Sequence, residues 1–170
     1  MIVMGIDQSF TSSGIVILNE EGNVNLFKTI NTGPEQGNIF DRSLLIADEI
    51  TLLIVNYNIE KVILEGLAFG LSHSTSLTDL AALQGIIIYS LLLMEMDNYK
   101  IITPGTLKKY ATGNGRASKK EVFEGLPEIV RDAIIEIGYK PTTGMYDIAD
   151  AYWLAKMGQD KKFESYMTNL

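Results

Sequence analysis

The sequence of 170 residues contains no cysteine and only one histidine. The missing cysteines exclude disulfide bonds, thiolate metal sites and a cysteine nucleophile, and they suit a reducing compartment such as the cytoplasm. The histidine, His73, lies in the polar run Leu71-Ser-His-Ser-Thr-Ser, which we interpret as a loop. A serine-type catalytic triad is therefore not expected.

Long apolar runs and targeting segments are also missing. The first residues, Met1–Asp7, predict a short apolar strand without a basic leader, so we expect no signal peptide. The longest apolar run, Ala81–Met94, falls short of the roughly 20 residues that a bilayer requires, so no membrane contact is expected. It indicates a helix that is either buried on a sheet or used to form a dimer. Length and a hydrophobic fraction of 46% fit one globular domain.

Positive charge is scarce overall and concentrated in one segment. The formal net charge of −7 argues at first against a nucleic-acid partner, because phosphate binding normally requires a basic surface. The segment from position 100 to position 120, however, has six basic residues and no acidic one: Lys100, Lys108, Lys109, Arg116, Lys119 and Lys120. This distribution is typical of one anion-binding edge, although a solvated loop has a similar composition.

The order of apolar patterns predicts three strands followed by alternating helices and strands. Turn signals separate strands at 2–6, 14–18 and 24–30, and further segments follow as helix 39–57, strand 61–65, helix 74–96, strand 99–103 and helix 104–110. Ser118 and Glu121 form a capping box that starts another helix. Gly125 and Pro127 break and restart it as Glu128–Ile137, and the last helix covers 145–157.

These elements predict an α/β fold in one domain, residues 1–157, with a solvated C-terminal tail over 158–170. We expect a mixed five-stranded sheet, made of a three-stranded antiparallel meander and two parallel strands, flanked by helices.

Two predicted strands end in a carboxylate. Asp7 follows the apolar run Val3-Met-Gly-Ile, and Glu65 ends Val62-Ile-Leu. If these strands are neighbours, the two acids lie about 5 Å apart, which is costly unless they share a cation or a proton. The alternatives are a turn-organising Asp7 and an exposed Glu65 at a strand end.

A second acidic pair, Asp147 and Asp150, occupies the start of the last predicted helix. Their spacing places both side chains on one face, one turn apart. A preference of acids for helix N-termini is one explanation. It leaves unexplained why both lie among apolar and small residues, a setting that predicts a helix packed on the sheet with its acids toward the core edge.

Four carboxylates without histidine or thiol partners form a hard-oxygen site, which prefers Mg²⁺ or Mn²⁺ to zinc. Two such ions roughly 4 Å apart are the arrangement used for in-line displacement at a phosphodiester. The sequence therefore predicts a metal-dependent nuclease built on Asp7, Glu65, Asp147 and Asp150.

The order of four segments resembles the RuvC Holliday-junction resolvases of the ribonuclease-H-like superfamily. The segments are Gly5-Ile-Asp7, Ile63-Leu-Glu65, Gly113-Asn-Gly-Arg-Ala-Ser-Lys119-Lys-Glu-Val122 and Asp147-Ile-Ala-Asp150-Ala. The resemblance covers residues 1–157. It implies a ribonuclease-H-like fold, two Mg²⁺ ions held by the four acids, and a homodimer that nicks four-way junctions in DNA recombination, repair or phage DNA processing.

The resemblance also implies roles for basic and aromatic residues. Lys108 and Lys119 match family lysines that contact or stabilise the scissile phosphate, so Lys119 is a predicted catalytic residue. Phe69 loosely matches an aromatic residue that stacks on bases, and a core or loop phenylalanine is an equal alternative. The predicted DNA-binding set is Phe69, Lys108, Lys109, Arg116, Lys119 and Lys120.

Two departures from the family pattern are visible. Gln8 follows Asp7 where the bacterial enzymes usually have Pro-Gly, and the chain is unusually acidic for a junction binder. Both suggest a divergent branch, such as a bacteriophage version acting in the bacterial host cytoplasm. They leave junction selectivity open without affecting the metal ligands.

Three alternatives remain on sequence alone. A broader ribonuclease-H-like nuclease acting on single-stranded DNA or RNA:DNA hybrid would use the same four acids. A phosphate-binding ATPase or kinase half-domain is suggested by Gly5-Ile-Asp7 and Ser12-Ser-Gly14, but its fold needs a second domain. A DNA-binding protein that has lost cleavage would not need all four acids.

Overall fold

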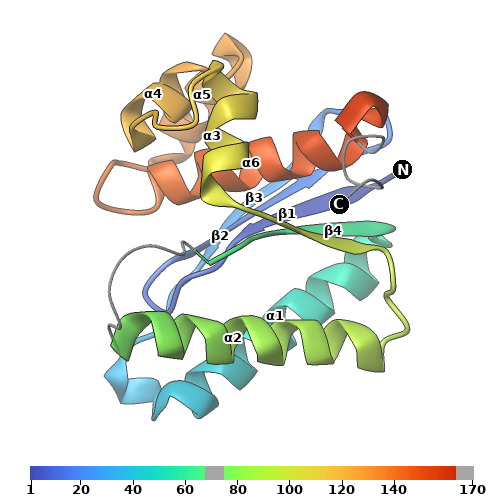
Figure 1. The fold of residues 1–170 in the computed structure, drawn as a ribbon, viewed down its shortest axis with the longest axis vertical. Helices are drawn as coiled ribbons and strands as arrows, with labels where there is room; N and C mark the ends of the chain where they lie inside the picture. The colour runs from blue at the N-terminus through green and yellow to red at the C-terminus, as the bar shows by residue number, and fades with distance from the viewer. Residues whose placement is uncertain (68–74, 164–170) are drawn as a thin grey trace.

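A computed structural model describes residues 1–67 and 75–163, and in these residues a five-stranded sheet lies between layers of helices (Figure 1). The strands are β1 (Val3–Asp7), β2 (Ser13–Leu18), β3 (Val24–Ile30), β4 (Lys61–Glu65) and β5 (Tyr99–Ile102), in the spatial order β3-β2-β1-β4-β5. The pairs β1–β2 and β2–β3 are antiparallel, whereas β1–β4 and β4–β5 are parallel. The predicted meander with two further parallel strands is confirmed.

Helices cover both faces of the sheet. α1 (Ile39–Tyr57), which follows the short 3₁₀ turn η1 (Pro34–Gln36), and α2 (Thr75–Leu93) lie on one face, and α6 (Met145–Gln159) lies on the other (Figure 1). Beyond α6 are α3 (Pro104–Thr112), α4 (Lys119–Glu124) and α5 (Glu128–Ile137). None of the helices in the described part of the chain has the length and apolarity to cross a bilayer.

The central strand β1 is buried along its whole length because helices cover both of its faces. Its side chains alternate between two cores, as the pleat of a strand requires. Val3 belongs to the core beneath α6, while Met4 and Ile6 belong to the core beneath α1 and α2. A strand buried on both faces has a continuous apolar run, which is why 2–6 is apolar throughout.

Side-chain caps fix several helix starts. The Ser118 hydroxyl accepts from the Glu121 N–H at 3.2 Å and the Glu121 carboxylate accepts from the Ser118 N–H at 2.7 Å, so the predicted capping box is confirmed. Asn38 and Asp41 form the same reciprocal box at the start of α1. At the start of α3, the Thr103 hydroxyl accepts from the Thr106 N–H.

Three predicted helix ends were wrong by a few residues. α3 ends at Thr112, two residues beyond the predicted Tyr110. α2 ends at Leu93 rather than Met96, because Glu95 adopts a left-handed φ of 58° and the Met96 N–H turns back to the Leu91 carbonyl at 3.0 Å. α6 continues to Gln159, two residues beyond the predicted end.

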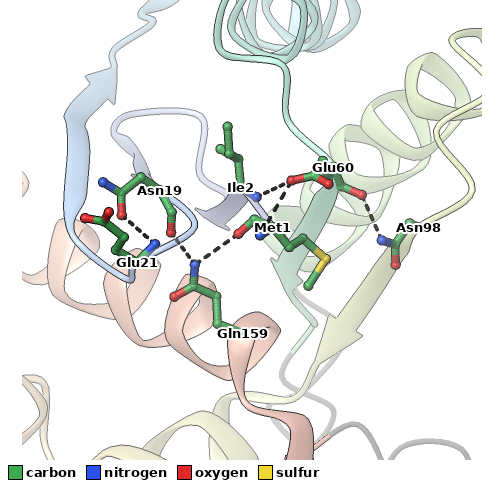
Figure 2. Close-up of polar contacts among 7 residues, drawn as sticks. All are labelled: Met1, Ile2, Asn19, Glu21, Glu60, Asn98 and Gln159. Atoms are coloured by element: carbon green, nitrogen blue, oxygen red, sulfur yellow. Dashed lines mark hydrogen bonds and ion pairs between the residues drawn. The ribbon is translucent and has the colours of Figure 1, made fainter.

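Polar contacts close the end of the sheet where the parallel strands begin (Figure 2). The Ile2 N–H donates to the Glu60 carboxylate at 2.6 Å, and Asn98 donates to the Glu60 carbonyl at 2.8 Å. From the end of α6, the Gln159 amide donates to the carbonyls of Met1 at 3.2 Å and Asn19 at 2.6 Å. The opposite edge, where β1 and β4 end, holds the acids.

Candidate active site

Asp7 and Glu65 lie side by side where β1 and β4 end. The two strands are parallel with Ile6 opposite Leu64, so the next residue in each is an acid. Adjacent strands are about 4.8 Å apart. Val3 and Ile63 belong to the core beneath α6. Because every second residue of a strand faces the same side, Asp7 and Glu65 face that side too. Both carboxylates therefore face α6.

Two glycines let α6 approach the sheet at this edge. A Cβ at Gly5 would lie 2.0 Å from the Ala151 carbonyl oxygen, and a Cβ at Gly14 would lie 2.2 Å from the Asp147 carbonyl oxygen. Gly14 is also the partner of Asp7 in the β1–β2 ladder. The backbone of Asp147 therefore passes directly over the strand position beside Asp7. No residue with a side chain fits at either glycine without moving the helix.

The same packing brings the helix acids to the strand acids. Asp150 is only 5% exposed, and Asp7 is 6% exposed. The pKa of Asp150 is raised to about 7, mainly by burial and then by the negative charge of Glu65; Lys119 opposes the rise and Asp147 adds to it. The charge interaction of Asp150 with Glu65 places this helix acid near the strand acid.

The pKa of Asp7 is raised well above its ordinary value, and burial is the main cause. The charge of Glu65 and a hydrogen bond with its carboxyl add to the effect, followed by the charge of Asp150. Like charges this close require a proton or a cation between them.

Lys119 is the basic residue that reaches the acids. Its ammonium donates to the Asp147 carboxylate at 3.2 Å. Burial lowers the pKa of Lys119, but the charges of Asp7, Asp147 and Asp150 outweigh this effect and raise it. A half-exposed, permanently charged ammonium beside the acids is suited to contacting a phosphate that enters from solvent.

Aromatic packing holds α3 and α4 beside α6 and so positions this lysine. The Trp153 ring N–H donates to the Val122 carbonyl at 3.1 Å, which joins α6 to α4. Tyr110 of α3 lies edge-on to Trp153, with ring centroids 6.0 Å apart, and its hydroxyl donates to Asp160 at 3.0 Å. Phe163 packs on the same tyrosine, so the first residues after α6 lie against the domain.

The remaining predicted DNA contacts differ in their positions. Lys108 is half-buried on α3 and close enough to Asp150 to oppose the rise in its pKa. Lys109 and Arg116 are exposed on α3 and the loop that follows it, and Lys120 is exposed beside Glu124 at 3.5 Å. Phe69 lies outside the described residues, as does His73.

The chemistry of the donors fits a hard divalent cation. All four side chains offer carboxylate oxygens, the ligands that Mg²⁺ prefers. Among residues 1–67 and 75–163, no group of three histidine or acidic side chains is arranged so that it could hold a metal ion as it stands. This agrees with the contacts found, because Asp147 is engaged by Lys119 and Asp7 by the Glu65 carboxyl. A cation would replace the proton and the lysine in neutralising these acids.

Sequence reasoning missed the residues that support the acids. Gly14 was expected only to begin the second strand or to belong to a phosphate loop, but this glycine pairs with Asp7 across the ladder and also admits α6. The amides of Gln8 and Gln84 both donate to the Glu65 carbonyl oxygen, each at 3.2 Å. The only available signal was a polar residue, Gln84, within the apolar run 81–94.

A hollow elsewhere on the surface lacks the chemistry for this site. It encloses about 640 Å³ between β3 and α5 and is lined by residues such as Phe27, Val130 and Ile137. Its lining contains no charged side chain.

Comparison with known proteins gives a family. The model of the family described as "Crossover junction endodeoxyribonuclease RuvC" matches residues 3–156. The protein of that name from Clostridioides difficile is 31% identical over 175 aligned positions, which cover 100% of this chain and 97% of that protein. The one from Helicobacter hepaticus is 29% identical over 158 positions, which cover 91% of this chain and 80% of that protein.

Solved structures agree on the fold. The Thermus thermophilus RuvC structure superposes with a TM-score of 0.71 at 21% identity, covering 99% of this chain and 97% of that one. T. thermophilus RuvC in complex with Holliday junction substrate gives a TM-score of 0.68 at 16% identity, covering 98% and 96%. The matched residues contain the acidic edge and its supporting helices, and the chain belongs to the RuvC family of crossover junction endodeoxyribonucleases.

Proposed function

We propose that this chain is a Mg²⁺-dependent, structure-selective endonuclease that cleaves four-way DNA junctions and related branched DNA by hydrolysis of a phosphodiester. The observation that carries the proposal is the convergence of Asp7, Glu65 and Asp150 at one sheet edge, next to Lys119, in a chain of the RuvC family. The relatives that share its sequence are named for crossover junction cleavage.

In this proposal Asp7, Glu65, Asp147 and Asp150 hold two Mg²⁺ ions, for which Mn²⁺ can substitute. When bound, such ions activate a water and neutralise charge on the leaving oxygen. The chain itself supplies the orientation: β1 and β4 fix two carboxylates, and α6 fixes the other two through the close approach at Gly5 and Gly14.

Lys119 has a separate role in the proposal. Its ammonium lies at the rim of the acidic cluster, half-exposed, and is held by Asp147. As a phosphate of the scissile strand enters, this ammonium orients it and stabilises the charge that develops on its oxygens. Lys108, Lys109, Arg116 and Lys120 extend the positive surface along α3 and α4 and contact flanking phosphates.

We further propose that two copies associate through α1 and α2. The outer faces of these helices expose large apolar side chains: Phe40, Leu44, Leu52 and Val55 on α1, and Tyr89, Leu92 and Leu93 on α2. Large apolar side chains that remain exposed on neighbouring helices are typical of a protein interface. A homodimer would present two active sites to the two symmetric strands of a junction, and two linked contacts raise affinity.

The domain that carries this activity is proposed to be residues 1–157, supported by the family match over 3–156. We place the protein in the cytoplasm, in keeping with the absence of cysteine from the sequence.

The proposed function is tested by offering a four-way junction, a Y-fork, a linear duplex and an RNA:DNA hybrid with Mg²⁺. We expect paired nicks in the junction by the wild-type protein and none by Asp7→Asn. Equal activity of Asp7→Asn would refute the metal site. Cleavage restricted to the hybrid or to single strands would refute junction cleavage and favour a broader nuclease of the same fold.

A further inference from the structure

Two glutamine side chains converge on one backbone carbonyl beneath the acidic edge. The Nε2 atoms of Gln8 and Gln84 each donate to the Glu65 carbonyl oxygen at 3.2 Å. Gln8 follows the last residue of β1, and Gln84 lies in the middle of α2. Three elements are thus joined at the residue that carries a catalytic carboxylate.

The convergence occurs where the main-chain ladder stops. The last pair of the β1–β4 ladder is Ile6 with Leu64, one residue before the two acids. On its other side, β4 stays paired with β5 through Glu65 opposite Ile102, and the Gly66 N–H donates to the Ile102 carbonyl at 2.7 Å. Toward β1, the Gln8 amide continues the pairing that the backbone has ended.

The glutamines lie on the opposite side of the sheet from the carboxylates. Because residues alternate along a strand, Asp7 faces α6, and the next side chain, Gln8, faces α1 and α2. Gln84 comes from α2 on that same face. Neither amide therefore takes part in the carboxylate cluster directly, and both act on it through the backbone of Glu65.

The Gln8 amide is an unfavourable choice for packing alone. The side chain is only 8% exposed, and its Oε1 accepts no hydrogen bond from any residue that the structure describes. An unsatisfied buried acceptor destabilises the folded state. An apolar side chain of the same length would fill the space without that cost. What the glutamine amide adds is the hydrogen bond that it donates to the Glu65 carbonyl oxygen.

We infer that Gln8 and Gln84 are positioning residues that form an amide clamp on the Glu65 carbonyl, fixing the Glu65 carboxylate beside Asp7 for divalent metal binding. The inference rests on the proposed function, in which Glu65 is a metal ligand. The clamp is the chain's own means of holding the two strand ends together at the point where like charges push them apart.

A clamp of this kind has a measurable consequence. Groups that orient metal ligands typically contribute 10- to 100-fold to metal affinity when they are removed. Because both amides hold the same oxygen, either one alone retains part of the constraint. We expect a loss of Mn²⁺ affinity of about 3-fold in each single variant and of about 30-fold when both are removed. Two independent 3-fold effects would multiply to only about 9-fold, so the two effects combine non-additively.

The test uses the full chain with Gln8→Met, Gln84→Met and the double variant, since methionine keeps the length and removes the amide. Gln159→Met is the matched control, because Gln159 also donates to two backbone carbonyls but at the opposite end of the sheet (Figure 2). Mn²⁺ affinity is measured by calorimetric titration at pH 7.5, and stability by urea unfolding in EDTA.

The expected result is weaker Mn²⁺ binding in the Gln8 and Gln84 variants and unchanged binding in Gln159→Met, whatever the changes in stability. Unchanged Mn²⁺ affinity in both folded single variants and in the double variant would overturn the clamp. If the double variant does not fold, the comparison of each single variant with Gln159→Met decides.

Failure of the proposed function is a separate result. One outcome is that wild-type protein binds Mn²⁺ through Asp7, shown by loss of binding in Asp7→Asn, and yet cleaves no junction. That result would refute the proposed function, and the Mn²⁺ affinities of the glutamine variants would still test the clamp. Junction cleavage by wild type, with the same Mg²⁺ dependence in the double variant, would support the function and overturn the clamp.

Discussion

Asp150→Asn is expected to stabilise the metal-free protein at neutral and alkaline pH. Asp150 is 5% exposed, and burial together with the charge of Glu65 raises its pKa to about 7 from an ordinary 3.8. The folded chain therefore binds this proton more tightly than the unfolded chain. Stability falls as the pH rises from about 4 to about 7, and above about 7 the full cost is present.

The magnitude follows from the two pKa values. A tenfold change in proton affinity corresponds to about 1.4 kcal/mol, so a carboxyl moved from 3.8 to about 7 lowers the free energy of unfolding by about 4 kcal/mol at pH 8. Asparagine removes the charge but leaves a buried amide to be satisfied. The expected gain is therefore smaller, about 2 kcal/mol at pH 8 in EDTA and close to zero at pH 4.

Urea unfolding at pH 4, 6 and 8, with EDTA or with Mg²⁺, tests this reasoning. The matched control is Asp132→Asn, which removes one charge from the exposed face of α5 and should change little. Mg²⁺ should stabilise the wild type and not Asp150→Asn, because an ion that binds only the folded state adds to its stability. An Asp150→Asn protein less stable than wild type at pH 8 in EDTA would refute the assigned burial and charge repulsion.

Three further variants test other parts of the site. Lys119→Met should lower the single-turnover rate of junction cleavage by about 100-fold, because it removes the ammonium that contacts Asp147; a rate within twofold of wild type would exclude a catalytic lysine. Gly5→Ala places a methyl group 2.0 Å from the Ala151 carbonyl oxygen and should lower the free energy of unfolding by about 3 kcal/mol in urea, whereas Gly85→Ala, with open space around it, is the control. Leu93→Glu should convert the dimer to monomer in sedimentation equilibrium, and an unchanged mass would move the interface elsewhere.

The strand acids could be predicted from sequence because their positions are set by local pattern. A buried apolar run followed by an acid places Asp7 and Glu65 at strand ends without knowledge of the rest of the chain. To predict that the two acids are close also requires the order of the strands in the sheet, which follows from the alternation of helices and strands along the chain. The capping box at Ser118 is local in the same sense, and it fixed the start of α4.

The supporting contacts could not be predicted because each joins distant parts of the chain. Gln84 lies 19 residues from Glu65, and Lys119 lies 28 residues from Asp147, so no periodic pattern connects them. Lys119 was singled out only through resemblance to a family. The role of Gly14 depends on which helix lies over it, and that is known only once α6 is placed on the sheet.

The glycine variants and Asp150→Asn are expected to change the free energy of unfolding in opposite directions at the same edge of the sheet. This difference separates the effect of packing from the effect of charge. Gly5 and Gly14 bring α6 close enough that acids from helix and sheet share one buried volume, so enlarging either glycine should destabilise the fold. Removing the charge of Asp150 should instead stabilise it. A surface selected for stability alone would keep the close packing and neutralise the acids. Buried like charges at a tightly packed edge are expected of a binding site, because the stability lost to their repulsion is regained only when a cation binds.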